Sequence, residues 1–589
     1  MGAFFLYKKD SAVLAEEAEK IFNRKGFSQP NKFDLGEWKL LLYKKIAVEV
    51  DNYAFKENYS LFSCGTVVYK GLGYCDSLNK LLEDLISGSV NQDDLIGHFC
   101  LLFWDGQNLT ALTDQLNTYH VFYNDKKTVL TSSFLAALSS SPNKLPLNRL
   151  ALCEKLSAGY IVSPDTLVDG IWQIDDEGMG RFSLAEHNIS FIKHLAMPEI
   201  KMHSQGKEES LNKQIEVLQR HFAQLDNINT EFGGDLGLSD GYDSRLLLAC
   251  SLAYLRKPLT LHTHATSGVH DSSKAIVEAI VKYFNLRLNS VETRQLEKLS
   301  AKRVQHILED GLMFFDSRSS HNMGAMSETY TREYKIKTIA GSKMSFNGLG
   351  GEIYRNYYES RRCGKIDFSD WLNYNVFYPF APDVIGNRIF SDMAKYKISK
   401  VKKRLGNSCK EKVDFFTVRR YYSEVRMPDC DANNSDAQNQ VTFYHMPFIQ
   451  PKIISEGLAA TNYIGLGGSY QSKLINRINA ELSSFNSHYG YAFDKRMPLK
   501  YLLRSALKEL APVNILSLRI KEKLEKKSNI TIDETSNFIE SQDILKIGRD
   551  ILLEKGLISN FDYSLIHYAQ RPTALYICSF LSEFNDKIK

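Results

Sequence analysis

The sequence is poor in cysteine and proline and contains no long apolar run. Its 589 residues include nine Cys and 14 Pro, and the cysteines stand singly, without Cys-x-x-Cys pairs. This pattern argues against a disulfide framework and offers no zinc-binding spacing. No apolar stretch approaches the roughly 20 residues of a transmembrane helix, and the opening residues are too short for a signal peptide. We therefore expect a reduced, cytoplasmic protein without a membrane span.

An excess of charge of one sign is also lacking. The 73 Lys and Arg nearly balance the 69 Asp and Glu, which leaves a net charge of +4. Such a chain has no overall field that would attract nucleic acid or an anionic membrane. Apolar residues make up 43% of the sequence, with 31 Tyr and 33 Phe among them. This length and composition favour a globular protein of two or more domains.

The first 200 residues are predicted to form an α+β sandwich. A helix is expected at 77–86. β-branched or alternating segments predict strands at 45–50, 65–69, 98–104, 108–112, 121–123, 128–131, 172–174, 178–184 and 189–194. Two pairs of these segments are separated by short turns, which predicts hairpins.

The pattern changes near residues 198–207, so we divide the chain into domains at 1–200 and 206–589. Apolar residues at helical spacing follow, and then a strand at 259–263, a helix at 272–284 and a strand at 286–291 are predicted. Strands alternating with helices favour a parallel sheet, whose ligands bind beyond the carboxyl ends of the strands.

Beyond about residue 300 the chain is predicted to be mostly helical. Its polar stretch 426–440 is expected to form a mobile loop. A helix is expected at 500–510, and the mixed charges of 519–527 are typical of a solvated face.

The segment 232–245 has the pattern of a strand end, a tight loop and a helix start. Gly241 lets the backbone pass close to a ligand, and Ser239 and Ser244 supply hydroxyl groups. The free N–H groups of the helix that follows suit a phosphate. Asp243 would lie beside that phosphate, where a divalent cation would have to bridge the two negative groups. An ordinary strand–turn–helix with a Ser or Asp cap is the alternative for this loop alone.

A second glycine-rich loop occurs at 346–354, where Gly348, Gly350 and Gly351 precede Glu352. Read alone, it is equally consistent with a plain loop between core elements. Together, the two loops predict a nucleotide site with magnesium. Three histidines also lie near the first loop, at positions 262, 264 and 270. Without a carboxylate framework they are better explained as residues in or beside a strand than as metal ligands.

In their order and spacing these motifs resemble the asparagine synthetase family over nearly the whole chain. The family loop S-G-G-x-D-S corresponds to residues 239–244, and G-x-G-x-D-E corresponds to 348–353. Further similar segments are 97–106, 114–116, 122–123, 133–138, 446–448, 502–512 and 519–522. The resemblance implies an N-terminal Ntn-type αββα sandwich that corresponds to a glutaminase domain. It also implies a C-terminal parallel-sheet ATP-pyrophosphatase domain, like that of adenine nucleotide α-hydrolases, with a large helical part.

The resemblance also implies ATP and Mg²⁺ as cofactors and assigns roles to single residues. Asp243 and Glu352 would hold the metal, and both would act in catalysis together with Lys521, which would meet the phosphates. The remaining nucleotide contacts fall on the phosphate-binding Ser239, Gly241 and Ser244 and on the nucleoside-lining Leu238, Thr263 and Gly348.

Departures from the family pattern affect both domains. Gly2 stands where the glutaminase has its nucleophilic cysteine, and a glycine has no side chain to attack an amide. The segment 70–72 replaces the glutamine-binding N-G-E, so glutaminase activity is expected to be lost. Asp240 replaces a glycine beside the phosphates, where a like charge at about 4 Å costs about 1 to 4 kcal/mol unless it is relieved. Leu349 stands where asparagine synthesis uses a glutamate, which argues against aspartate as the substrate.

The resulting expectation is an asparagine synthase-like, AMP-forming carbon–nitrogen ligase without its own glutaminase activity. It would adenylate a small-molecule or peptide carboxylate near residues 354–357 and transfer the acyl group to an amine or ammonia, as β-lactam synthetases and lasso-peptide cyclases do. Proteins of surface-polysaccharide loci are also similar. A homodimer or a partner biosynthetic enzyme is expected. The alternative is a non-catalytic scaffold or nucleotide-binding protein. Nitrogen or sulfur transfer to tRNA is disfavoured by the near-neutral charge.

Overall fold

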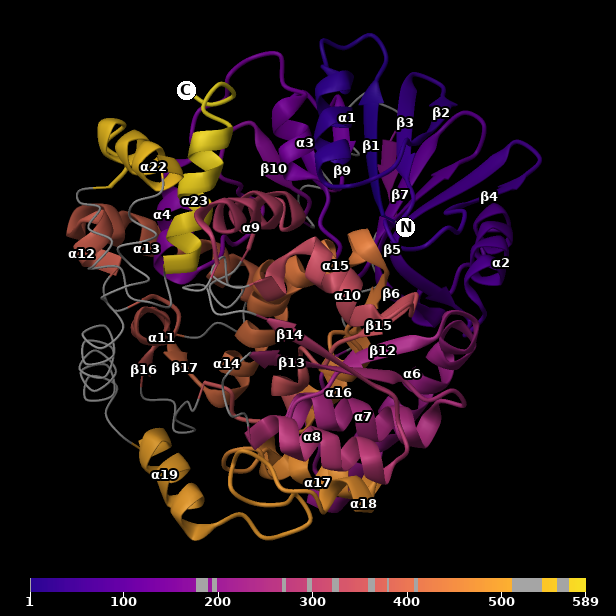
Figure 1. The fold of residues 1–589 in the computed structure, drawn as a ribbon, viewed down its shortest axis with the longest axis vertical. Coiled ribbons are helices and arrows are strands. Elements are labelled where there is room, and N and C mark those ends of the chain that lie inside the picture. Colours follow the sequence, from indigo (N-terminus) through magenta and orange to yellow (C-terminus); the bar gives the residue numbers. More distant parts are fainter. Residues whose placement is uncertain are drawn as a thin grey trace.

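The computed structural model describes residues 2–175, 179, 189–192, 199–266, 272–293, 299–319, 328–358, 366–378, 381–406, 411–510, 543–558 and 571–589. Within them the chain is a mixed α/β structure with two mainly antiparallel sheets, one five-stranded parallel sheet and a large helical part (Figure 1). In these ranges no helix is both long and apolar enough to cross a membrane.

The N-terminal part contains the two mainly antiparallel sheets. The first has the order β10-β8-β9-β1-β3-β2 and the second the order β11-β7-β6-β5-β4, in which only β11 runs parallel to its neighbour. The strands of the first are β1 (Ala3–Lys8), β2 (Asn31–Leu35), β3 (Trp38–Tyr43), β8 (Phe122–Asn124), β9 (Val129–Thr131) and β10 (Ile171–Gln173). Those of the second are β4 (Tyr53–Lys56), β5 (Tyr59–Tyr69), β6 (Leu95–Trp104), β7 (Leu109–Thr113) and β11 (Ile189–Phe191).

These two sheets lie face to face, with a helix layer on each outer side. Alternating residues such as Phe4 and Leu42 of the first sheet pack against Phe62 and Leu102 of the second, because successive side chains of a strand point to opposite faces. On the outer face of the first sheet lie α1 (Ala15–Arg24) and α3 (Phe134–Ser139), and α2 (Tyr74–Ile86) covers the second. The predicted helix at 77–86 and both predicted hairpins are therefore confirmed.

The parallel sheet follows in the order β14-β13-β12-β15-β18, and every neighbouring pair is parallel. Its strands are β12 (Gly234–Gly237), β13 (Thr260–Thr266), β14 (Leu288–Thr293), β15 (Met344–Phe346) and β18 (Phe443–His445). In Figure 1 the helices α6 (Lys207–Phe232), α7 (Tyr242–Tyr254) and α8 (Ser272–Tyr283) lie below this sheet, and α10 (Arg332–Ile339) and α15 (Ala432–Val441) lie above it. The predicted parallel sheet is thus confirmed.

Most of the rest of the described chain is helical. It comprises α4 (Arg149–Ala158), α9 (Ala301–Phe314), α11 (Phe368–Asn375), α12 (Ala381–Ile385), α13 (Asn387–Leu405), α14 (Phe415–Tyr421), the π-helix η6 (Tyr422–Asp431), α16 (Pro451–Ala459), α17 (Ser469–Ile478), α18 (Ala480–Ser483), α19 (Leu499–Leu510), α22 (Asp543–Glu554) and α23 (Arg571–Glu583). A short ladder joins β16 (Ile366–Asp367) and β17 (Lys412–Val413). Near the chain's end α23 packs on α9 and α4, so the two ends of the sequence share one core.

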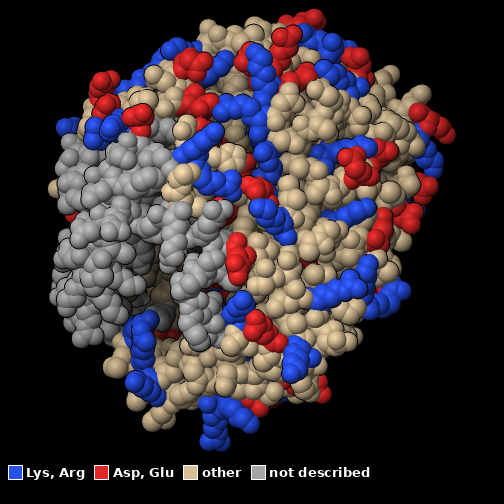
Figure 2. Space-filling model, in the orientation of Figure 1, with Lys and Arg blue, Asp and Glu red and all other residues tan. Residues whose placement is uncertain are grey.

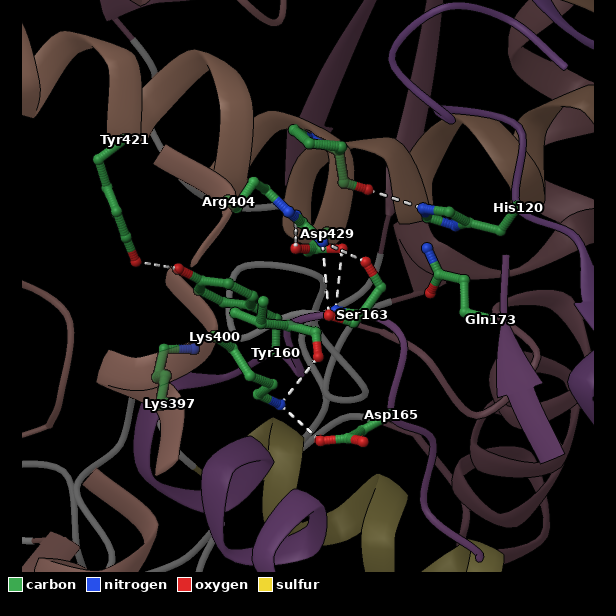
Figure 3. A network of polar contacts seen from close by, with 12 residues as sticks. His120, Tyr160, Ser163, Asp165, Gln173, Lys397, Lys400, Arg404, Tyr421 and Asp429 are labelled. Atoms are coloured by element: carbon green, nitrogen blue, oxygen red, sulfur yellow. Dashed lines mark hydrogen bonds and ion pairs between the residues drawn. The ribbon is translucent and has the colours of Figure 1, made fainter. Parts of the chain in front are cut away.

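Buried ion pairs join the N-terminal part to the helical part (Figure 3). Glu154 of α4, which has no exposed side-chain area, lies 2.8 Å from both Lys397 and Lys400 of α13. Lys400 also lies 2.7 Å from Asp165, and Arg404 of the same helix pairs with Asp429 of η6. On the surface, by contrast, no single sign of charge dominates: basic and acidic side chains are interspersed over the described part of the face in Figure 2.

Two sequence predictions are wrong. Residues 45–50 form no strand beyond an isolated bridge between Lys45 and Val48. Their backbone N–H groups turn instead to the end of α15, where Ile46 and Ala47 donate to the carbonyls of Gln440 and Val441. The predicted loop 426–440 is helical and largely buried, as part of η6 and α15. Its polar side chains have partners elsewhere in the chain, such as His120 for Asp436. The predicted strand at 178–184 lies, apart from residue 179, outside the described residues.

Candidate functional site

The two glycine loops meet at the carboxyl edge of the parallel sheet. The first follows β12 and leads into α7, which begins at Tyr242, and the second follows the neighbouring strand β15. Gly348 packs on the first loop so tightly that a Cβ there would lie 2.8 Å from the carbonyl carbon of Asp243. A Cβ on Gly351 would lie 2.3 Å from Asp243 Oδ1. These glycines are therefore needed because the second loop lies directly on the start of α7.

The loop after β18 completes this edge. Gly350 has a φ of +91°, and a Cβ on it would approach Ile449 Cγ1 to 2.6 Å and the carbonyl carbon of Phe448 to 3.0 Å. Only glycine adopts such a backbone readily. The loops after three adjacent parallel strands are thus in contact, as expected of a ligand site at this edge of a sheet.

Asp243 and Glu352 converge, and the guanidinium of Arg355 lies between them. Arg355 Nη1 donates to Asp243 Oδ1 at 3.0 Å and Nη2 donates to Asp243 Oδ2 at 2.8 Å, which makes a bidentate pair. The same Nη2 lies 3.1 Å from Glu352 Oε1. Although burial lowers the pKa of Arg355, the two carboxylates raise it above its ordinary value. Arg355 is thus a fully charged counter-ion for both acids.

Two neutral side chains also donate hydrogen bonds to these acids. Gln471 of α17 donates from Nε2 to Asp243 Oδ1 at 2.8 Å, and the hydroxyl of Tyr422 donates to Glu352 Oε2 at 2.7 Å. The pKa of Asp243 is raised to about 6, mainly because the carboxyl group is buried; Arg355 and the hydrogen bond from Gln471 oppose this rise, and the charge of Glu352 adds to it. Every carboxylate oxygen of Asp243 and Glu352 therefore has a hydrogen-bond partner within the chain.

The serines of the first loop bond to each other. The hydroxyls of Ser239 and Ser244 are 2.9 Å apart, and the backbone N–H of Ser239 donates to Ser244 Oγ at 3.1 Å. Gly241 has a φ of −81°, and the nearest atom to a Cβ placed on it would be Ser239 Oγ at 3.4 Å. The serine pair fixes the loop, and a Cβ at Gly241 would be in ordinary van der Waals contact with its neighbours.

Both carboxylate oxygens of Asp240 are taken by side chains outside this loop. Its Oδ1 lies 2.8 Å from Nδ1 of His488, and its Oδ2 accepts from the hydroxyl of Ser273 at 2.9 Å. The side chain is only 6% exposed. The repulsion expected between Asp240 and a bound phosphate is therefore reduced by two partners on other elements.

The remaining predicted residues lie at or near the same edge, with one exception. Leu238 donates its N–H to the carbonyl of His262 at 2.9 Å, which sets it beside Thr263 in the middle of β13, and both residues are buried. The backbone N–H of Leu349 donates to Asn347 Oδ1 at 2.8 Å, and its side chain packs against the core. Lys521 lies outside the described residues.

The histidines of β13 have structural partners. His262 Nδ1 lies 2.5 Å from Asp235 Oδ2, and His264 Nδ1 lies 2.7 Å from the hydroxyl of Tyr334. Within the described ranges no group of three His, Cys, Asp or Glu side chains could hold a metal ion. His270 is outside these ranges. The assignment of the two described histidines to strand contacts is consistent with this geometry.

The cavity beside Glu352 and Arg355 is small. Its volume of about 10 Å³ is close to that needed for one water. Tyr357, Tyr358 and Tyr422 line it, whereas Tyr354 is fully buried and accepts a hydrogen bond from Gln214 at 2.8 Å. Tyr357 thus lies where the sequence placed a substrate pocket, and Tyr354 belongs to the core.

Gly2, which stands where the glutaminase family has its nucleophilic cysteine, is packed closely against other residues. A Cβ on Gly2 would lie 2.4 Å from the carbonyl oxygen of Lys44 and 2.6 Å from the ring of Phe27. Lys70, in the segment that replaces the glutamine-binding motif, pairs with Asp84 at 2.6 Å. No side chain fits at position 2 without a shift of its neighbours.

The geometry also tests whether the two acids suit a divalent cation. Hard carboxylate oxygens are the ligands that Mg²⁺ prefers. As arranged, however, the oxygens of Asp243 and Glu352 point to a guanidinium, a hydroxyl and an amide. A metal does not fit between them while Arg355 is in place.

The role of Arg355 between the acids, and the contacts of Gln471 and Tyr422, were not predicted from the sequence. Neither Gln471 nor Tyr422 belongs to a motif. Comparison with known proteins adds no relative, because no family model and no curated protein matches the chain.

Proposed function

We propose that this protein is an ATP-dependent, AMP-forming amide-bond synthetase of the asparagine synthetase-like kind, without glutaminase activity. The observation that carries the proposal is the convergence of Asp243 and Glu352 at the start of α7, on adjacent loops of a parallel sheet. Free backbone N–H groups at a helix start attract phosphate. The paired acids distinguish this site from a simple anion site.

In the proposed reaction, a carboxylate oxygen attacks the α-phosphorus of ATP and pyrophosphate leaves. An amine nitrogen then attacks the acyl carbon, loses a proton to the medium and displaces AMP. The chain's contribution is to position the reactants and to provide electrostatic stabilisation. Ser239, Gly241 and Ser244 would surround the phosphates.

Further assignments follow from the same proposal. Leu238, Thr263 and Gly348 would line the nucleoside, and Lys521 would meet the developing charge. Asp243 and Glu352 would hold magnesium only after Arg355 leaves them, so no step above depends on the metal. The proposed substrate is a small-molecule or peptide carboxylate, and the proposed partner is a second copy of the chain or another biosynthetic enzyme.

Two observations favour the alternative of a non-catalytic scaffold or nucleotide-binding protein. Arg355 already neutralises part of the acid pair. Leu349 brings no polar side chain to the second loop. Calorimetry with ATP separates the possibilities, because binding without turnover supports a nucleotide-binding scaffold and absence of binding supports a scaffold alone.

The test of the proposal is AMP and pyrophosphate formation from ATP over a panel of carboxylates and amines. We expect equal amounts of AMP and pyrophosphate with one class of carboxylate. Asp243→Ala should abolish both products, and Asp76→Ala, at an exposed acid of α2 in the N-terminal part of the chain, should leave them unchanged. The proposal is wrong if no carboxylate gives AMP and the Asp243 variant behaves as the wild type does.

A further inference from the structure

One side chain, that of Arg355, holds the two acids together. Asp243 comes from the first turn of α7, and Glu352 comes from the second glycine loop. Both bond to one guanidinium, that of Arg355, which lies three residues beyond Glu352. A single cation of the chain itself therefore bridges two loops that are more than 100 residues apart in sequence.

The guanidinium of Arg355 is held by several groups of the chain. It makes two hydrogen bonds to Asp243 and one to Glu352, and its Nη1 also lies 3.3 Å from Oε1 of Gln471. Its guanidinium carbon lies 5.8 Å from the centre of the Tyr242 ring. The side chain is 17% exposed. A planar fork with bidentate geometry is what distinguishes Arg from Lys at such a site.

The charges of Asp243, Glu352 and Arg355 do not cancel. Two ionised carboxylates carry two negative charges, and Arg355 supplies one positive charge, so the trio keeps one negative charge. The same oxygens are those that a divalent cation would need. A metal and the guanidinium cannot use them at once.

We propose that Arg355 is the resident cation of this site and competes with divalent metal for Asp243 and Glu352. The inference rests on the proposed function only for the identity of the site. Metal enters when Arg355 leaves, and the freed guanidinium then lies beside the start of α7, where it can pair with phosphate in the same bidentate way. The site therefore responds to metal together with nucleotide and binds metal alone poorly.

The experiment measures Mn²⁺ binding to the full chain without nucleotide, from the loss of the electron paramagnetic resonance signal of free Mn²⁺. We expect weak binding to the wild type and at least tenfold tighter binding to Arg355→Met, a change of about 1.4 kcal/mol. Arg355→Lys keeps one positive charge and should bind nearly as weakly as the wild type. Adding Glu352→Gln to Arg355→Met should remove the gain, which locates the metal.

Equal affinity of the wild type and Arg355→Met for Mn²⁺ would overturn the proposal, as would tight binding to the wild type that Glu352→Gln abolishes. Arg355→Gln is the second variant in case Arg355→Met does not fold. Its melting temperature should rise with added Mg²⁺ more than that of the wild type, and an equal rise in both contradicts the competition. Because nucleotide is absent, this outcome is separate from the test for AMP formation.

Discussion

The substitution Gly241→Ala separates ligand approach from folding at the start of α7. Gly241 has a φ of −81°, which alanine adopts readily, and a Cβ there would come no closer than 3.4 Å to Ser239 Oγ and 3.7 Å to His488 Cε1. Alanine is a poorer helix N-cap than glycine by about 1 kcal/mol at most, and it lowers the entropy of the unfolded chain by about 0.4 to 1 kcal/mol. These effects nearly cancel, so stability should change by less than about 1 kcal/mol.

The same methyl group would lie where the phosphates of a nucleotide are proposed to approach the backbone. We expect Gly241→Ala to weaken ATP binding at least tenfold, about 1.4 kcal/mol, by isothermal calorimetry. Thermal denaturation on the same samples checks that the fold is intact. Unchanged ATP affinity in a folded Gly241→Ala protein would refute the placement of the phosphates at this loop.

Three further predictions concern packing, buried charge and pH. Gly351→Ala places a methyl group 2.3 Å from Asp243 Oδ1, so it should break the pair with the arginine and lower stability by about 1.5 to 3 kcal/mol; an unchanged melting temperature would contradict this. Glu154→Gln leaves Lys397 fully buried without its main counter-ion, which should cost about 3 to 5 kcal/mol in urea denaturation, and a loss under about 1 kcal/mol argues against a buried ion pair. Burial lowers the pKa of His221 to about 3, so the unfolded chain binds more protons below about pH 6.5 and stability should fall as pH drops from 6.5 towards 3, by up to about 1.4 kcal/mol per pH unit for this residue. His221→Gln should flatten that slope, and an equal slope in both proteins rules the residue out.

The sequence predicts the described strands and helices best where local pattern and tertiary contacts agree. The hairpin of β6 and β7 joins two mostly apolar segments across a short turn, and both of its strands are largely buried. The segment 45–50 is also rich in apolar residues, but its backbone donors at Ile46 and Ala47 are taken by the end of α15. Periodicity carries no information about that distant partner.

The loop prediction for the polar stretch 426–440 is wrong for a related reason. Its composition is typical of a loop, yet Asp429 pairs with Arg404 and Asp436 pairs with His120. Buried charges are tolerated when they are paired, and these partners lie up to 316 residues away. Composition alone therefore predicts exposure where the fold provides counter-ions.

The candidate site also has a part that the sequence predicts and a part that only the fold reveals. Both glycine loops are visible as local patterns, because tight turns require particular residues at fixed spacing. The bond between Arg355 and Asp243 spans 112 residues, and that between Gln471 and Asp243 spans 228. Only the fold brings these residues together, so their effect on the acids could not be predicted.

The most direct test of the central claim is a crystal structure of the full chain with a non-hydrolysable ATP analogue. We predict phosphate density within hydrogen-bonding distance of the backbone at Gly241 and the start of α7, with Arg355 moved away from Asp243. An analogue bound elsewhere, or no analogue bound while Arg355 still bridges Asp243 and Glu352, would contradict the account.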